Sequence, residues 1–247
     1  MLALRSAFYN VAFYFNLLVW LIAAIPTLLM PRRFFMEIAR LWGVSSLWLL
    51  RVIAGTQVRW TGLDKLPSGG CIVAAKHQSA WETFALFAVL KDPAIILKRE
   101  LTLIPLFGWC LLKAEMIPVR RGQTGREALT EMSAKARKAI AEGRQLLIFP
   151  EGTRRPAGAP PDYKSGVAHL YAATGAICVP IALNSGVYWP RRALIRRPGT
   201  VAVEVLDPIA PGMRPKAFLA ELRARIEGAS ARLVEEGRRE TGQSLAE

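Results

Sequence analysis

Two side chains in one short polar stretch form the pairing that general base catalysis uses. His77 is one of two histidines in the chain, and the carboxylate of Glu82 follows it five positions later. A carboxylate bonded to one imidazole nitrogen fixes the tautomer of the ring and leaves the other nitrogen as a base. Because the reference pKa of imidazole is about 6.5, such a base can take a proton from an alcohol near neutral pH.

Five residues rotate by about 140° on one continuous helix, which would separate these two side chains. The pairing therefore needs a turn at residues 78–80, with Glu82 in the first turn of a helix that Ser79 caps. The flanking sequence favours this turn, because residues 71–75 are typical of a buried strand and residues 83–90 fit a helix. Taken alone, the pair would favour a loop histidine beside a carboxylate that stabilises a helix N-terminus.

The strongest single motif is Phe-Pro-Glu-Gly-Thr-Arg at residues 149–154, after the apolar run 145–149. Gly152 permits a tight turn or a close approach of the backbone. Arg154 supplies a planar guanidinium that can hold a phosphate through two hydrogen bonds, and Glu151 can pair with that arginine or bond a hydroxyl. The competing interpretation is a polar surface turn. A nucleotide-binding P-loop is excluded because the sequence G-x-x-x-x-G-K-[ST] does not occur.

Two further cationic segments also follow apolar runs. Lys98 comes directly after residues 94–97, and Arg120 and Arg121 come directly after residues 116–119. If these runs are parallel strands, their carboxyl ends lie at one edge of the sheet with His77, where ligands bind in such folds. Each cation alone fits a surface charge. Three cationic segments beside a histidine indicate a binding site for an anionic group.

The alternation of short apolar runs with helical segments predicts an α/β fold with a mostly parallel central sheet flanked by helices. Strands are expected at residues 57–60, 71–75, 94–97, 116–119, 145–149, 177–183 and 200–206. Helices are expected at residues 83–90, 126–142, 166–174 and 215–238. Two parts are expected in the chain, namely membrane-anchoring helices at residues 1–55 and a larger domain at residues 56–247.

The N-terminal part is predicted to be a membrane-associated helical hairpin. Residues 8–30 carry no charge, and this run is long enough to span a bilayer. Residues 34–54 are interrupted by Glu37, Arg40 and Arg51, as in an amphipathic helix at a membrane interface. A simple span by the first helix is the alternative, whereas a core helix pair of a soluble protein fits the uncharged run less well.

The composition agrees with a membrane partner. The 33 Lys and Arg residues exceed the 19 Asp and Glu residues, and the net charge of +14 implies an anionic partner. A hydrophobic content of 52% and a mean hydropathy of +0.25 favour a membrane over nucleic acid, for which no reader motif occurs. The three cysteines lie apart in apolar runs without C-x-x-C spacing. We therefore expect reduced thiols, no metal site and a domain that faces the cytosol.

Four blocks, in order across about residues 70–185, resemble the glycerolipid acyltransferase family. Residues 77–82 resemble its H-x4-D block, residues 98–100 and 117–121 its second block, residues 149–154 its F-P-E-G-T-R block and residues 179–181 its short fourth block. Three positions depart from the family pattern. Glu82 stands where Asp is usual, Lys76 where Asn is common, and Arg120 where an acidic residue often occurs. None of these changes removes a group that the mechanism of the family needs.

The resemblance implies an enzyme of phospholipid biosynthesis that acts on lysophosphatidate. Such an enzyme transfers an acyl chain from acyl-CoA or acyl carrier protein to the sn-2 hydroxyl, giving phosphatidate without a covalent enzyme intermediate, a metal or a cofactor. It implies His77 as the base and Glu82 as the residue that orients the imidazole. The residues implied to bind the phosphate and glycerol are Lys98, Arg121, Glu151, Gly152, Thr153 and Arg154.

The expected location is the inner membrane, with the catalytic domain on the cytoplasmic face. The expected partners are the bilayer, the lysolipid and the acyl thioester, with acyl carrier protein as one possible donor. A near alternative is the acylation of another lyso-lipid, such as a lysophospholipid or a lyso-ornithine lipid. A more distant alternative is a non-catalytic basic protein that binds membranes, which would not need His77 and Glu82 together.

Overall fold

The computed structural model describes residues 1–120 and 126–243. Within these residues the strands form one central sheet: β1 (Thr56–Thr61), β2 (Cys71–Ala75), β3 (Pro93–Lys98), β4 (Ile117–Val119), β5 (Gln145–Ile148), β6 (Cys178–Leu183) and β7 (Gly199–Val205). Their order across the sheet is β1-β7-β6-β2-β5-β3-β4. All neighbouring strands pair in parallel except β6 and β7, which are antiparallel. The predicted mostly parallel sheet and each of its predicted strands are confirmed.

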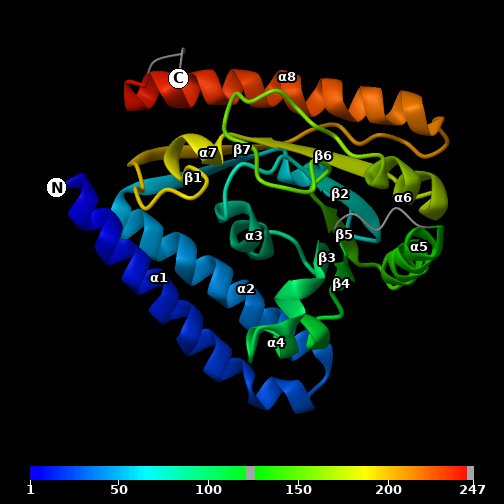
Figure 1. The fold of residues 1–247 in the computed structure, drawn as a ribbon, viewed down its shortest axis with the longest axis horizontal. Coiled ribbons are helices and arrows are strands. Elements are labelled where there is room, and N and C mark those ends of the chain that lie inside the picture. The colour runs from blue at the N-terminus through cyan, green and yellow to red at the C-terminus, as the bar shows by residue number, and fades with distance from the viewer. Residues whose placement is uncertain (121–125, 244–247) are drawn as a thin grey trace.

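Helices cover both faces of the sheet and form a hairpin at the N-terminus (Figure 1). The α-helices are α1 (Leu2–Ala24), α2 (Arg32–Leu49), α3 (Trp81–Ala85), α4 (Phe107–Lys113), α5 (Arg126–Ala141), α6 (Gly166–Thr174), α7 (Ser185–Tyr188) and α8 (Pro215–Thr241). Shorter helical turns are η1 (Pro26–Leu29), η2 (Leu50–Ala54), η3 (Leu63–Lys65), η4 (Leu86–Ala88) and η5 (Arg99–Leu103). The four helices predicted after the hairpin are present, the first as α3 followed by η4. Neither α4 nor α7 is predicted by the sequence, because each is short.

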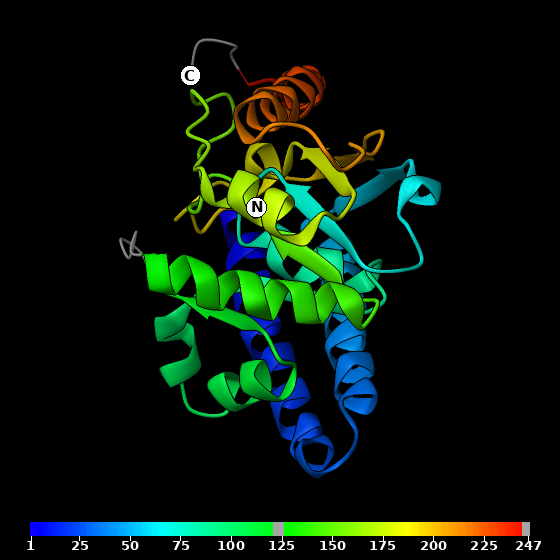
Figure 2. The same cartoon turned by 90° about the vertical axis from the view of Figure 1, so that its right-hand side faces the viewer.

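The alternation of side chains along β2 divides the core between the two faces of the sheet. Cys71, Val73 and Ala75 face the side covered by the hairpin, α3 and α4. Ile72 and Ala74 face the side covered by α5, α6 and α8, where α5 lies beside α6 (Figure 2). Because both faces are buried, this strand is apolar throughout, as in other parallel sheets.

The hairpin of α1 and α2 is fastened to the rest of the chain near both ends of α1. Near the N-terminus, Asn10 Nδ2 donates to the carbonyl oxygen of Leu194 at 2.9 Å. At the tip, Arg32 Nη1 contacts the two carboxylate oxygens of Asp92 at 2.6 and 2.8 Å. Helix α1 therefore lies along the molecule and does not project from it as an independent segment.

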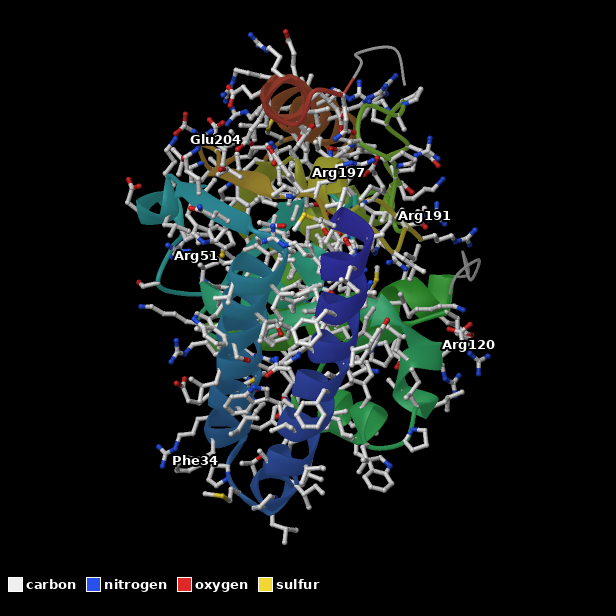
Figure 3. All side chains as sticks on the ribbon, turned by 90° about the vertical axis from the view of Figure 1, so that its left-hand side faces the viewer. Phe34, Arg51, Arg120, Arg191, Arg197 and Glu204 are labelled. Carbon is white, nitrogen blue, oxygen red and sulfur yellow. The ribbon has the colours of Figure 1, made fainter. Side chains whose placement is uncertain are left out.

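The outer face of α1 is apolar and exposed. Residues 2–29 form a segment of 28 residues that contains a window of 18 residues with a mean hydropathy of 2.0, and only 11% of this window is buried. Among the described residues, it is the one helical segment long and apolar enough to cross a membrane, by length and composition alone. Figure 3 shows the aromatic and aliphatic side chains along this hairpin. Low burial disfavours a core helix of a soluble protein. The division of the chain at residue 55 stays a prediction.

Candidate active site

The loops that follow β2 and β5 are held against each other at one edge of the sheet. The backbone N–H of Arg155 donates to the carbonyl oxygen of His77 at 2.8 Å. The imidazole of His77 stacks on the ring of Phe149, with centroids 4.0 Å apart and planes inclined by 19°. Because β2 and β5 are parallel neighbours, their carboxyl ends bring the two motifs into one site.

The turn after His77 folds the carboxylate of Glu82 back over residues 78–79. Glu82 Oε1 accepts the N–H of Gln78 at 2.6 Å and that of Ser79 at 3.0 Å. The hydroxyl of Ser79 accepts the N–H of Trp81, the first residue of α3, at 3.0 Å. The predicted turn and the place of Glu82 in α3 are confirmed, whereas the N-cap of α3 is Ala80, one residue after Ser79. The bond between Glu82 and the imidazole of His77 stays a prediction.

Burial is the main determinant of the pKa of Glu82. Its side chain is fully buried, and this burial raises the pKa of Glu82 to about 7 against the opposing effect of the hydrogen bonds that it accepts. The carboxyl therefore changes charge in the pH range where an imidazole acts as a base. Buried carboxyls with pKa values of this kind are common at catalytic sites.

Helix α7 supports this turn from a distant part of the sequence. The hydroxyl of Ser185 donates to Glu82 Oε1 at 2.9 Å, and the N–H of Gly186 donates to Gln78 Oε1 at 2.9 Å. A Cβ at position 186 would lie 2.9 Å from the Cβ of Gln78, so the contact requires glycine. Sequence reasoning missed both residues, because a Ser-Gly pair after a strand is typical of any turn.

Gly152 lets the motif after β5 turn sharply toward the same edge. Its φ of 64° lies in the left-handed region that favours glycine, and its N–H donates to the carbonyl oxygen of Phe149 at 2.9 Å. The half-buried Arg154 follows this turn and lines the cavity that His77 also lines. The expected role of Gly152 in a tight turn is confirmed.

Glu151 is buried and paired with a lysine. Lys76 Nζ lies 3.0 Å from Glu151 Oε1 and 2.7 Å from Glu227 Oε1 on α8. Tyr163 also donates to Glu227 Oε1, at 2.9 Å. Burial raises the pKa of Glu151, and the attraction of Lys76 opposes this shift. The sequence suggested Arg154 or a hydroxyl as the partner of Glu151. In the structure the partner of Glu151 is instead Lys76. Lys76 is one of the positions that depart from the family pattern.

One cavity of about 770 Å³ brings the candidate base and the cations together. The sheet side of its lining includes His77, Lys98, Gly152, Arg154 and Lys164. The opposite side is apolar and comes from α1, α2 and α4, with residues that include Trp20, Ala24, Phe35, Trp42, Cys110 and Leu111. A polar edge thus opens into a large apolar space, which suits a lipid with a charged headgroup.

The remaining predicted site residues lie around this cavity or outside the described structure. Glu82 and Glu151 are buried and do not contribute to the lining. Thr153 is half-buried between two residues of the lining, Gly152 and Arg154, but does not contribute to it. Arg121 lies outside the described residues. The edge of the sheet therefore holds the candidate base, His77, and two of the expected phosphate ligands, Lys98 and Arg154, in one place.

A family model of acyltransferases matches residues 57–184, which include β2 to β6 and the site residues predicted from the sequence. The chain belongs to the acyltransferase family. This acyltransferase also has the fold seen in the crystal structure of the 1-acyl-sn-glycerophosphate (LPA) acyltransferase PlsC from Thermotoga maritima. The two match with a TM-score of 0.78 and 21% sequence identity, over 94% of this chain and 99% of the other.

Two curated relatives of the acyltransferase cover most of its length. A protein from Pseudomonas aeruginosa named 1-acyl-sn-glycerol-3-phosphate acyltransferase is 38% identical over 188 residues, which are 75% of this chain and 72% of the relative. A mouse protein named 1-acyl-sn-glycerol-3-phosphate acyltransferase alpha is 30% identical over 84% of this chain and 74% of its own. Together with the exposed apolar hairpin, these relatives indicate that the acyltransferase associates with a membrane.

Proposed function

We propose that this acyltransferase is a 1-acyl-sn-glycerol-3-phosphate O-acyltransferase, which acylates the sn-2 hydroxyl of lysophosphatidate to give phosphatidate. The observation that carries the proposal is the common cavity of His77, Lys98 and Arg154, whose other side is apolar. A single-chain lipid with a phosphate monoester matches this distribution of charge and apolar surface. The names of the relatives from Pseudomonas aeruginosa and mouse support the same acceptor.

In the proposed reaction, His77 acts as the general base. It takes the proton of the sn-2 hydroxyl while that oxygen attacks the carbonyl carbon of the acyl thioester. The new C–O bond forms, the C–S bond breaks, and the departing thiolate receives the proton from the imidazolium. The acyl group passes directly from donor to acceptor. Glu82 is held in place by the hydrogen bonds that it accepts from residues 78–79 and from Ser185. When Glu82 is ionised, its carboxylate stabilises the imidazolium of His77.

Lys98 and Arg154 are proposed to hold the phosphate of the acceptor. They come from neighbouring strand ends, because β3 pairs in parallel with β5. The guanidinium of Arg154 can give two parallel hydrogen bonds to a phosphate, whereas Lys98 contributes a point charge. Lys98 Nζ lies 3.1 Å from Glu100 Oε1 near the surface, so the incoming phosphate would compete with that carboxylate.

The acyl donor is proposed to be a thioester of coenzyme A or of acyl carrier protein. The thioester already carries an activated acyl group, so the proposal includes no further cofactor. The reaction is proposed to occur at the cytoplasmic face of the inner membrane. There the hairpin would keep the cavity at the lipid surface while soluble donors reach it, and the three buried free thiols suit a reducing compartment.

An acyl-transfer assay with purified protein tests the proposal. We expect transfer from acyl-CoA to lysophosphatidate in clear preference to lysophosphatidylcholine, lysophosphatidylethanolamine and lyso-ornithine lipid, because only lysophosphatidate carries a phosphate monoester. His77→Ala should lower kcat by about 1000-fold. His169→Ala, at the other histidine, which is exposed on α6, serves as the matched control and should keep wild-type activity. Retained transfer by His77→Ala, or equal rates with all four acceptors, would contradict the proposal.

A further inference from the structure

A second cavity, of about 530 Å³, lies beside the active site at the β3–β4 edge of the sheet. Its lining comes from η5, from β4 and from the outward side of α5. Three cationic side chains contribute to it, namely Arg99, Arg120 and Lys135. Figure 3 shows Arg120 at the outer edge of the molecule, away from the hairpin. The reaction proposed above uses none of these three residues.

The charge of this cavity is positive. Among the described residues of its lining the single carboxylate is Glu131, which pairs with Lys135 at 2.7 Å on the exposed face of α5. Lys135, and more weakly Arg99, lower the pKa of Glu131, so this carboxylate faces cations from two elements. Three cations and one carboxylate give the described part of the lining a net charge of +2. Two arginines on neighbouring elements offer the paired N–H groups that phosphate oxygens accept.

The floor of the second cavity is apolar. In its lining, Ile117 on β4 is buried and Leu129 and Met132 on α5 are partly buried, whereas the three cations are exposed. A methionine and branched aliphatic side chains provide a surface on which a planar heterocycle can pack. A cationic rim above an apolar floor, in a space of this size, suits a nucleotide better than an inorganic anion.

The two cavities share a wall. Val119 lines both of them, and the consecutive residues Lys98 and Arg99 divide between them, with Lys98 in the first and Arg99 in the second. A ligand anchored in the second cavity can therefore extend along the ends of β3 and β4 into the first. This path joins a cationic, nucleotide-sized space to the place where His77 acts.

We propose that the second cavity binds the phosphorylated adenosine end of coenzyme A, with Arg99, Arg120 and Lys135 on its phosphates and the adenine over Ile117, Leu129 and Met132. The pantetheine arm then crosses the β3–β4 edge and carries the thioester to His77. This assignment rests on the proposed acyltransferase function and makes acyl-CoA the donor. It leaves the acceptor phosphate in the first cavity, on Lys98 and Arg154.

Kinetics with a complete and a truncated donor test this site. Arg120→Ala should raise the KM for acyl-CoA by about tenfold, the loss expected for one charge-assisted phosphate contact. With acyl-pantetheine, which lacks the nucleotide, wild type and Arg120→Ala should give the same kcat/KM, and the KM for lysophosphatidate should stay unchanged. Arg239→Ala removes an exposed arginine from α8 and is the matched control.

A binding measurement with adenosine 3′,5′-bisphosphate gives an independent readout. Calorimetry on the full-length protein in detergent should detect binding to wild type and at least tenfold weaker binding to Arg120→Ala. The compound should also inhibit competitively against acyl-CoA. No binding to wild type, or equal effects of Arg120→Ala on acyl-CoA and acyl-pantetheine, would overturn the assignment.

Two further outcomes would also overturn it. One is that Arg120→Ala loses activity only when acylated acyl carrier protein is the donor, which would make the cavity a docking surface for that protein. The other is weaker binding of Arg120→Ala to anionic vesicles with an unchanged KM for acyl-CoA, which would assign the cavity to lipid headgroups. Failure of the acyltransferase function itself would appear differently, as no transfer to lysophosphatidate from any donor.

Discussion

The buried carboxyl of Glu82 makes the stability of the protein depend on pH near neutrality. Its pKa is about 7 in the folded chain against an ordinary value of 4.5. Between these values the folded protein keeps a proton that the unfolded chain releases, so the free energy of unfolding falls as the pH rises through this window. The loss reaches about 3 kcal/mol above neutral pH.

Glu82→Gln cannot ionise, so its free energy of unfolding should fall less than that of wild type as the pH rises. Denaturant unfolding in detergent, from about pH 5 to about pH 8, gives the difference between the two proteins. Glu235→Gln, on the exposed surface of α8, should follow the wild-type curve. Parallel curves for wild type and Glu82→Gln would show that Glu82 is already ionised in the folded protein below this window.

The ion pair of Lys76 with Glu151 is a second residue-scale feature with a measurable consequence. Lys76→Met leaves the carboxylate of Glu151 buried without its cation and should lower the free energy of unfolding by about 3 kcal/mol. Lys76→Met/Glu151→Gln removes the stranded charge as well and should recover most of that loss. Denaturant unfolding of Lys76→Met, Glu151→Gln and the double variant measures the coupling free energy between the two residues.

Lys65→Met is the control for this cycle. It removes a lysine that pairs with Asp207 at the surface, where such pairs contribute less than about 1 kcal/mol. If Lys65→Met and Lys76→Met lowered the free energy of unfolding by similar amounts, burial of the Lys76–Glu151 pair would not increase the cost of losing the lysine.

The candidate site residues were predictable from the local sequence, whereas the distant residues that hydrogen-bond to the site were not. His77 and Arg154 each follow an apolar run, and a parallel sheet brings such positions to one edge. Glu227, the second partner of Lys76, comes 151 residues later, and Ser185 comes 103 residues after Glu82. No spacing rule links residues so far apart, because these contacts depend on how α7 and α8 pack.

At the scale of elements, the strands were predictable and the short helices were not. Strands buried on both faces appear as continuous apolar runs, so all of the expected ones are present. Helix α4 has only seven residues and follows Leu106, whose φ of 62° is uncommon for a leucine. Nothing in the local pattern indicates that α4 packs beside the hairpin on the same side of the sheet. The apolar side of the main cavity was therefore not predictable.

That apolar side should limit the length of the acyl chains that the protein accepts. Ala24 lies near the hairpin tip, is almost fully buried and lines the main cavity. Ala24→Phe places a ring in this space and should lower kcat/KM for the longest acyl chains by about tenfold while shorter chains are retained. Competition among acyl-CoA donors, and among lysophosphatidates, of graded chain length measures the change.

Val19→Phe is the matched control for the cavity, because Val19 is on the exposed face of α1 and does not line the cavity. It should leave the chain-length profile unchanged. If Ala24→Phe lowered activity equally at all chain lengths, the hairpin side of the cavity would not contact the end of an acyl chain.

At the scale of the whole molecule, net charge and exposed apolar surface together determine how the protein binds a bilayer. The sequence predicts a membrane-associated hairpin but not its attachment near both ends of α1, which depends on Asn10 and Arg32 reaching distant partners. A helix held in this way presents one long apolar face beside the domain. This arrangement favours a hairpin that lies against or within one side of the bilayer over a simple span.

Removing two aromatic side chains from this face should weaken membrane binding. Phe8 and Phe15 are 64% and 66% exposed, so their replacement removes little internal packing. Phe8→Ser/Phe15→Ser should weaken partitioning into vesicles by about 100-fold, since burial of each ring contributes about 1.5 kcal/mol or more. Sedimentation with vesicles of an anionic and a zwitterionic lipid measures partitioning.

The same experiment separates the apolar from the electrostatic contribution. The net charge of +14 should make wild-type binding stronger on anionic vesicles, and added salt should remove that preference. The double phenylalanine variant should lose affinity on both vesicles by a similar factor, because it removes no charge. Met213→Ser, in the turn before α8 and away from the hairpin, should bind as wild type does. Unchanged binding of the phenylalanine variant would mean that the exposed face of α1 does not contact lipid, and that cationic residues elsewhere bring the cavity to the membrane.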